Sequence, residues 1–204
     1  MFKKIITSRK LIKQALSKPH IKRMMEDLYN YDIYTYRHSL NVARESIYVG
    51  ITMALNKKQL INLTTAALLH DIGKMDIPLN ILNKPAKLTP AEFMEIKKHT
   101  KYGYDRLKVT GKFDTEILEG VLYHHENYDG TGYFGIAEKD LPLIARIIRV
   151  ADTYDAMTDN RCYKKKKTPR DAINEMEDLC TLDSDIVEAF KVPPRGKKIY
   201  KTKN

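Results

Sequence analysis

Apolar residues recur at helical spacing along almost the whole chain, and this pattern constrains the fold more than any other feature. Between residues 32 and 55, for example, Leu40, Ala43, Ile47 and Ile51 keep the helical period, and few segments alternate with the period of two that strands require. The sequence therefore predicts an all-α fold. The expected helices span about 11–16, 19–28, 32–55, 59–70, 114–126, 143–157 and 183–190.

Capping residues mark two further helix starts. Thr89 can accept hydrogen bonds from free amides, Pro90 suits the first helical position, and Glu92 stands at the third. Thr168 followed by Pro169 has the same character. Residues 127–133 contain two glycines and an aspartate, which permit unusual backbone angles and predict a loop.

The basic character of the chain belongs to its two ends. Of a formal net charge of +10 over 204 residues, residues 1–30 carry +6 (eight basic, two acidic) and residues 191–204 carry +6 (six basic, no acidic). Residues 31–190 carry −2, with 22 basic and 24 acidic residues. A nucleic-acid-binding domain more often has a basic face within its fold, so nucleic acid is the least favoured partner.

Length and charge together suggest three parts. We expect a short basic helical cap at 1–30, one main domain at 31–190 and a basic tail at 191–204. The cap is expected to pack onto its own domain; dimerisation and contact with a membrane surface are the alternatives. Cys162 and Cys180 are too few for a disulfide scaffold, and no run of about 18 apolar residues spans a membrane, so a cytoplasmic location is expected.

Seven imidazole and carboxylate side chains lie at the ends or on the expected inner faces of helices. They are His38, His70, Asp71, His99, His124, His125 and Asp152. Each alone is more often structural than a ligand. Together they stand out, because His70 and Asp71 directly follow an apolar helix face, and Gly73 permits a sharp turn that brings Lys74 back toward them. Asp152 lies in an apolar helix, where an unpaired carboxylate is costly.

The number and type of these groups indicate two metal ions. Neighbouring side chains on a helix point about 100° apart, so His124 and His125 suit different ions. Imidazole with carboxylate fits Fe, Mn, Ni or Zn, and the absence of thiolates among the seven argues against a structural zinc site. Two ions a few ångströms apart can clamp a hydroxide and hold a phosphoryl oxygen in line for attack. This chemistry implies hydrolysis of a phosphate ester.

Three segments of the sequence resemble the signatures of the HD-GYP subgroup of the HD-domain phosphohydrolases. The first is His-Asp-Ile-Gly-Lys at 70–74, and the second is His-His-Glu-Asn-Tyr-Asp-Gly-Thr-Gly-Tyr at 124–133. The third covers residues 146–158. The resemblance runs from roughly residue 34 to residue 190, and the order and spacing of the motifs make it specific.

The resemblance implies an HD-domain helical bundle with a glycine-containing substrate loop. It also implies hydrolysis of cyclic di-GMP to the linear dinucleotide and GMP, with a hydroxide bridging two divalent ions, Fe or Mn before Ni or Zn. The first ion would be held by His38, His70, Asp71 and Asp152. The second would be held by Asp71, His99, His124 and His125. Asp71 would thus be shared, and Lys74 would neutralise a phosphate oxygen beside it.

Substrate contacts also follow from the resemblance. Tyr133 occupies a position that in the family lies near a base or phosphate of the dinucleotide. Arg161 and Lys164 occupy positions that in the family contact phosphate oxygens. A cyclic dinucleotide carries two negative charges, which agrees with such basic partners. Without the resemblance, Arg161 and Lys164 would be assigned to an exposed basic loop.

The chain departs from the family pattern at three positions. Tyr34 stands four residues before His38, where some members place a Glu that holds a third metal, so we predict two metals. Phe134 replaces the Pro of Gly-Tyr-Pro, and Cys162 replaces another usual Pro, both on the substrate side. These changes leave two alternatives: a non-catalytic cyclic-dinucleotide receptor, and a hydrolase of another cyclic dinucleotide such as cyclic GMP-AMP. A monomer and a homodimer both fit the sequence.

Overall fold

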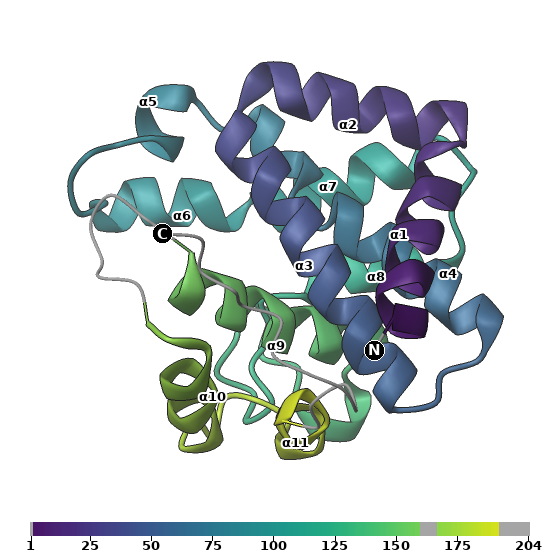
Figure 1. Cartoon of the computed structure of the whole chain (residues 1–204). Coiled ribbons are helices and arrows are strands. Elements are labelled where there is room, and N and C mark those ends of the chain that lie inside the picture. The colour runs from purple at the N-terminus through teal and green to yellow at the C-terminus, as the bar shows by residue number, and fades with distance from the viewer. Residues whose placement is uncertain (1, 160–166, 192–204) are drawn as a thin grey trace, which may run out of the picture.

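A computed structural model describes residues 2–159 and 167–191, and within these ranges it contains helices, turns and loops but no strand (Figure 1). The all-α prediction is confirmed. The α-helices are α1 (Phe2–Leu16), α2 (Pro19–Tyr31), α3 (Ile33–Thr52), α4 (Lys57–Leu69), α5 (Leu79–Leu82), α6 (Pro90–Lys97), α7 (His99–Lys108), α8 (Thr115–Tyr123), α9 (Leu143–Thr158), α10 (Pro169–Glu177) and α11 (Ser184–Lys191). Two 3-10 helices are η1 (Ile72–Asp76) and η2 (Glu138–Asp140).

Side-chain caps begin the helices where the sequence places them. The Thr89 hydroxyl accepts from the Glu92 amide while the Glu92 carboxylate accepts from the Thr89 amide, which makes a capping box at α6. Thr168 likewise caps α10. Four predicted ends were wrong. α1 begins at Phe2 and not near residue 11, and α2 continues to Tyr31, beyond the expected end at residue 28. The other two helices end about one turn early. α3 stops at Thr52, before Ala54 with its positive φ of 57°, and α8 stops at Tyr123, which leaves His125 and Glu126 outside the helix.

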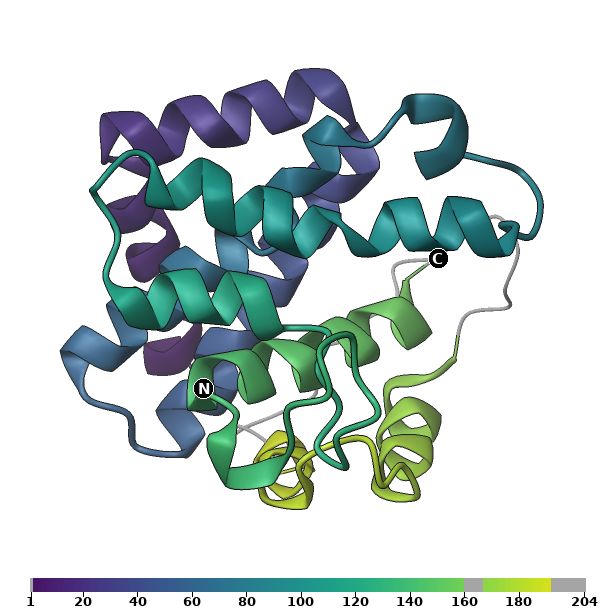
Figure 2. The same cartoon turned by 180° about the vertical axis from the view of Figure 1, so that it is seen from behind.

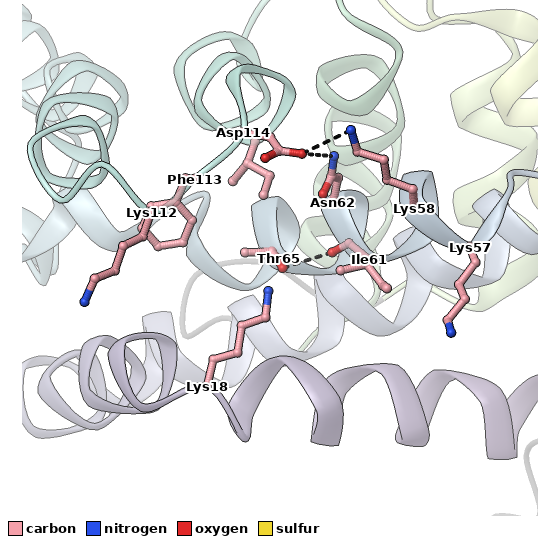
Figure 3. Close-up of a pocket in the computed structure, with 10 residues that line it drawn as sticks. Lys18, Lys57, Lys58, Ile61, Asn62, Thr65, Lys112, Phe113 and Asp114 are labelled. Atoms are coloured by element: carbon pink, nitrogen blue, oxygen red, sulfur yellow. Dashed lines mark hydrogen bonds and ion pairs between the residues drawn. The ribbon is translucent and has the colours of Figure 1, made fainter.

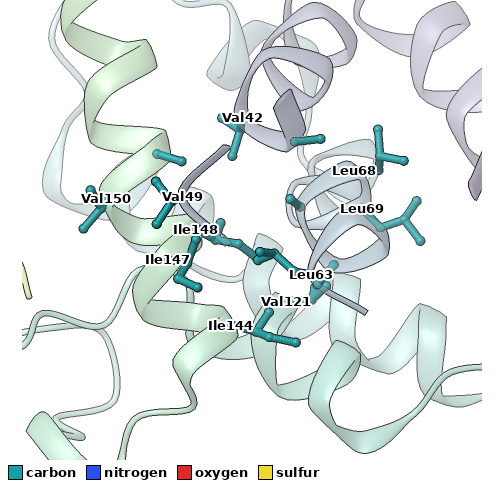
Figure 4. Close-up of a cluster of buried hydrophobic side chains, with 14 of the residues drawn as sticks. Val42, Val49, Leu63, Leu68, Leu69, Val121, Ile144, Ile147, Ile148 and Val150 are labelled. Carbon is teal, nitrogen blue, oxygen red and sulfur yellow. The ribbon is translucent and has the colours of Figure 1, made fainter. Parts of the chain in front are cut away.

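The hydrophobic core lies between α3, α4, α8 and α9. Figure 4 shows Val42 and Val49 of α3, Leu63 of α4, Val121 of α8 and Ile147 of α9 as members of one cluster of buried side chains. All five are fully buried. Burial of a side chain of this size stabilises the fold by about 1.5–3 kcal/mol, so this core fixes the relative positions of the helices that carry the predicted metal ligands.

The N-terminal helices pack onto the same core. Ile21, Met25 and Leu28 of α2 are buried in the cluster that also contains the side chains of α3 and α4, and Ala15 joins it from α1. The structure therefore favours packing of 1–30 onto its own domain. The division into parts at residues 30 and 190 stays a prediction, and residues 192–204 of the expected tail lie outside the described residues.

Two peripheral segments flank the core. α5 and α6 form an arm at the left of Figure 1, and neither helix has a buried residue. The loop between α8 and α9 extends toward α10 and α11 when the molecule is seen from behind (Figure 2), and there the Tyr128 amide donates to the Thr181 carbonyl at 2.9 Å. None of the described helices has both the length and the apolar character needed to cross a membrane.

Candidate metal centre

Six elements bring the seven predicted metal ligands into one cluster. His38 lies on α3 and Asp152 on α9, while His70 follows the last residue of α4. The others stand at helix ends: Asp71 precedes η1, His99 is the first residue of α7, and His124 and His125 follow α8. Because the core holds these helices together, residues far apart in sequence share one site.

Asp71 lies at the centre of this cluster, with one carboxylate oxygen on each side. Its Oδ2 atom is 3.3 Å from His70 Nε2 and 3.6 Å from His38 Nε2. Its Oδ1 atom is 3.3 Å from His99 Nε2 and 3.9 Å from His124 Nε2. A carboxylate in this position can bind a separate ion through each oxygen.

The ligand atoms separate into two groups around Asp71. In one group, atoms of Asp71, His99, His124 and His125 all lie within 4.8 Å of one another. In the other, atoms of His38, His70 and Asp152 do so, with His38 Nε2 3.0 Å from Asp152 Oδ1. The division corresponds to the two ligand sets that the family resemblance implies, and Asp71 Oδ2 lies beside the set of His38, His70 and Asp152. The expectation that His124 and His125 suit different ions was wrong: both fall in one group, because α8 ends before them and the angle between neighbours in a regular helix does not apply. All seven predicted ligands are therefore brought together.

Four of the imidazoles are oriented by hydrogen bonds from Nδ1. His70, His99 and His124 donate from Nδ1 to the carbonyls of the residues three positions earlier, at 2.9, 2.6 and 2.7 Å. These bonds place the proton on Nδ1 and leave Nε2 as an electron-pair donor facing Asp71. The Nε2 atoms of His99 and His124 then face each other at 3.3 Å. Two lone pairs at that distance suit a cation between them.

The fourth imidazole is oriented by Asp155, a residue that the sequence analysis missed. His38 Nδ1 donates to Asp155 Oδ2 at 2.7 Å, and the carboxylate is buried. Such a carboxylate raises the basicity of a metal-binding imidazole and fixes its ring. The available signal was the spacing of Asp152 and Asp155, three residues apart on an apolar helix.

Replacing Asp155 by Asn is expected to weaken metal binding about 10- to 100-fold, the range for partners of metal-bound imidazoles. Asn keeps the size of the side chain but removes the negative charge behind His38. The affinity for Mn²⁺ should be measured by competition with a chelating dye. Asp140→Asn, at an exposed position in η2, is the matched control. Equal affinities of the two variants would contradict the assigned role of Asp155.

The carboxylates of the centre are held in their ionised form. Burial alone would raise the pKa of Asp71, but the Lys74 ammonium and His70 outweigh it and hold this pKa well below its usual value. Lys74 Nζ lies 2.6 Å from Asp71 Oδ2. In the same way, burial opposes ionisation of Asp152, and His38 keeps the pKa of Asp152 well below its usual value.

Histidine protonation also fits metal binding. Burial, with neighbouring histidines, lowers the pKa of His124 and of His125 well below the usual value, so both rings are neutral. Burial also lowers the pKa of His38, but Asp152 and Asp155 reverse this effect and raise it to about 9. A metal ion at this position would replace that proton, since only neutral imidazole binds metal.

Two buried atoms of the centre support the fit to metal ions. Within the described part of the chain, His70 Nε2 and Asp71 Oδ1 have no hydrogen-bond partner. A buried polar atom without a partner costs about 1–3 kcal/mol. These atoms belong to the two different ligand groups, so cations at both positions would satisfy them.

Gly73 permits a close approach between η1 and α7. A Cβ atom added at Gly73 would lie 2.0 Å from the His99 carbonyl oxygen and 2.4 Å from the Gly103 amide nitrogen. Packing, and not an unusual backbone angle, therefore requires a glycine at this position. The glycines with positive φ are at positions 111, 130 and 135, and Gly73 is not among them. This contact places His99 beside Asp71, and the expected return of Lys74 toward Asp71 is also observed.

The glycine-containing loop is anchored by Glu126, another residue without an assigned role in the sequence analysis. The buried Glu126 carboxylate accepts hydrogen bonds from the amides of Phe134 and Ile136 at 2.8 and 2.9 Å. A proline at position 134 would lack the first donor, so Phe134 adds a bond to the loop. Gly132 packs against Glu126 so closely that a Cβ atom would lie 2.5 Å from its Cα.

This loop places Tyr133 at the metal centre. The Tyr133 ring lies 4.8 Å, between centroids, from the ring of His125. Burial raises the pKa of Tyr133 to about 12, with smaller contributions from the charges of Asp152 and Asp71, although the nearby charge of Arg149 acts to lower it. The phenol is therefore neutral and can donate. The other predicted substrate contacts, Arg161 and Lys164, lie outside the described residues, as does Cys162.

A pocket of about 460 Å³ lies elsewhere, between the start of α2, α4 and the start of α8 (Figure 3). Three of its polar side chains interact with one another: Asn62 donates to Asp114 at 3.2 Å, and Lys58 lies 3.5 Å from the same carboxylate. None of the seven predicted metal ligands lines it. The pocket is therefore separate from the cluster of candidate metal ligands.

Known proteins resemble this chain in sequence. A sequence model of the HD domain family matches residues 11–185. A cyclic di-GMP phosphodiesterase of Pseudomonas aeruginosa is 41% identical over 146 residues, which cover 71% of this chain and 35% of that protein. A 3'3'-cGAMP-specific phosphodiesterase of Vibrio cholerae is 36% identical over 146 residues, 71% of this chain and 32% of that protein.

A solved structure has a fold similar to that of this chain. The solved structure of an HDG"Y"P protein from Bdellovibrio bacteriovorus has a TM-score of 0.63 to this chain at 23% identity, over 75% of this chain and 50% of that protein. This likeness concerns the fold alone. The chain spans about a third of the length of the two curated relatives named above.

Proposed function

Because this chain belongs to the HD domain family, as the resemblance to the HD-GYP subgroup predicted, we propose that it is a metal-dependent phosphodiesterase acting on cyclic di-GMP. The observation that carries the proposal is the position of Asp71. Its two oxygens face separate groups of imidazole and carboxylate ligands. The products would be the linear dinucleotide and GMP.

The centre would hold two divalent ions, with Fe or Mn preferred over Ni or Zn. One set is His38, His70, Asp71 and Asp152, and the other is Asp71, His99, His124 and His125. When bound, such a pair of ions polarises a phosphoryl oxygen and lowers the pKa of water. The ionised Asp71 and Asp152 and the neutral His124 and His125 are in the protonation states that this binding requires.

The chain's own residues would bind and orient the phosphodiester. Lys74 Nζ has three N–H donors, of which one reaches Asp71 and the others remain for a phosphate oxygen. Its charge offsets negative charge that develops on the phosphoryl group. Tyr133, with its proton retained, would donate to the substrate beside His125. Arg161 and Lys164 would bind phosphate oxygens.

Turnover by purified protein tests the proposal. Protein loaded anaerobically with Fe²⁺ or Mn²⁺ should convert cyclic di-GMP to the linear dinucleotide and GMP, as followed by chromatography, and chelation should stop the reaction. A panel containing cyclic GMP-AMP and cyclic di-AMP tests the choice of substrate. Binding of cyclic di-GMP without turnover with any of the four metals would overturn the enzyme assignment in favour of a receptor.

Hydrolysis of another cyclic dinucleotide is the second candidate, favoured by the cGAMP-specific relative and by Phe134, which stands next to Tyr133. Faster turnover of cyclic GMP-AMP than of cyclic di-GMP would select it. A monomeric or homodimeric state, a cytoplasmic location and contact of the basic N-terminal region with a membrane surface stay predictions from the sequence.

A further inference from the structure

One face of α6 carries two side chains that meet Tyr133. Phe93 and Lys97 are four residues apart, one helical turn, and so share a face. The Phe93 and Tyr133 rings lie 6.5 Å apart between centroids, edge to face at 87°. Lys97 Nζ lies 4.5 Å from the Tyr133 ring centroid. Since Tyr133 contacts the His125 ring, these contacts connect α6 to the metal centre.

Phe93 does not serve the hydrophobic core. Its side chain is 47% exposed, and it belongs neither to the buried cluster nor to the partly buried residues packed against it. The first turn of α6 makes polar contacts instead, namely its capping box and the ion pair of Lys84 with Glu92 at 2.6 Å. A single exposed Phe is ordinary on a protein surface, but this one stands beside a second ring, an ammonium group and the metal centre.

We propose that Phe93, Lys97 and Tyr133 form a nucleobase subsite next to the metal centre. This inference rests on the proposed function and specifies its substrate class as nucleotide phosphodiesters. A base would stack on the exposed Phe93 ring, and the Lys97 ammonium would face the negative charge of the phosphodiester. Stacking on an aromatic ring depends little on which base is present, so this subsite would accept either cyclic dinucleotide considered above.

Equilibrium binding tests the subsite without turnover. The probe is the phosphorothioate analogue of cyclic di-GMP, which resists hydrolysis, titrated by calorimetry into the full chain loaded with Mn²⁺. Phe93→Ala should raise the Kd about 5- to 100-fold, the range for loss of one stacked base. Phe93→Tyr, which keeps the ring, should stay close to the unmodified protein. Lys97→Met should also raise the Kd. The Kd of this variant should change less with salt concentration than the Kd of the unmodified protein.

Met94 supplies the matched control. It is adjacent to Phe93 on α6 and 58% exposed, and its side chain points about 100° away from that of Phe93 around the helix axis. Met94→Ala should leave the Kd unchanged. A Phe93→Ala protein that binds the analogue as well as the unmodified protein, or no worse than Met94→Ala, would overturn the subsite.

A second substrate separates this inference from the proposed function. Methyl p-nitrophenyl phosphate is a phosphodiester without a nucleobase, so its turnover by the Mn²⁺ protein should be the same in Phe93→Ala and in the unmodified protein. An equal loss of activity toward this ester and toward cyclic di-GMP would contradict the subsite. If neither diester is hydrolysed but the analogue still requires Phe93 for binding, the proposed function falls and the subsite stands.

Discussion

Asp71→Asn is expected to reduce cyclic dinucleotide hydrolysis by more than about 1000-fold. The substitution removes the charge on which both ligand groups converge, since Asp71 Oδ2 faces His70 and Oδ1 faces His99. Metal ions contribute several kcal/mol to phosphoryl-transfer transition states, and each 1.36 kcal/mol is about tenfold in rate. Asn keeps the size of the side chain, so the fold should persist.

The comparison must separate loss of the centre from loss of the fold. The kcat/KM for cyclic di-GMP and the metal content per chain should be measured together with the helical circular dichroism signal. Asp76→Asn is the control, because Asp76 ends the same 3-10 helix and its partner Arg106 is at the surface. Activity of Asp71→Asn above a tenth of the unmodified value, with two metals retained, would refute the shared-carboxylate assignment.

Gly73→Ala is expected to lower the free energy of unfolding by about 2–4 kcal/mol, in the upper range for overpacked sites. The new Cβ would meet two backbone atoms, the His99 carbonyl oxygen and the Gly103 amide nitrogen, neither of which can rotate away. η1 and α7 would have to separate. For a chain of about 200 residues this corresponds to a fall in Tm of roughly 4–16 °C, and displacement of His99 should also weaken metal binding.

Gly111→Ala distinguishes crowding from backbone strain. Gly111 has a positive φ of 64°, but a Cβ atom there would meet nothing within 4 Å. Its substitution should cost only about 1 kcal/mol and should leave metal affinity intact. Thermal unfolding of both variants, followed by circular dichroism, measures the difference. A smaller effect at Gly73 than at Gly111 would show that the approach of η1 to α7 is not essential.

Local sequence patterns predicted most of the helices because their signals lie within one helical turn. Thr89 and Glu92 are three residues apart, and the apolar spacing of α3 needs no knowledge of its neighbours. The seven candidate metal ligands could likewise be selected by residue type and by position, either at helix ends or on the expected inner faces of helices. Their division into two sets came from the family resemblance, because spacing along the chain does not tell which helices meet.

The residues that were missed make contacts that span more of the sequence than one helical turn. Asp155 contacts His38 from 117 residues away, and Glu126 accepts from amides that follow it by 8 and 10 residues in an irregular loop. The close approach at Gly73 depends on a helix that begins 26 residues later. Each of these contacts depends on the packing of separate elements, which no local pattern encodes.

The number and position of bound metal ions test the central claim most directly. Protein purified anaerobically with Mn²⁺ should contain two ions per chain by elemental analysis. Anomalous diffraction from its crystals should place them about 3.5–4 Å apart, with Asp71 bound to both. A single ion per chain, or two ions of which only one contacts Asp71, would contradict the account.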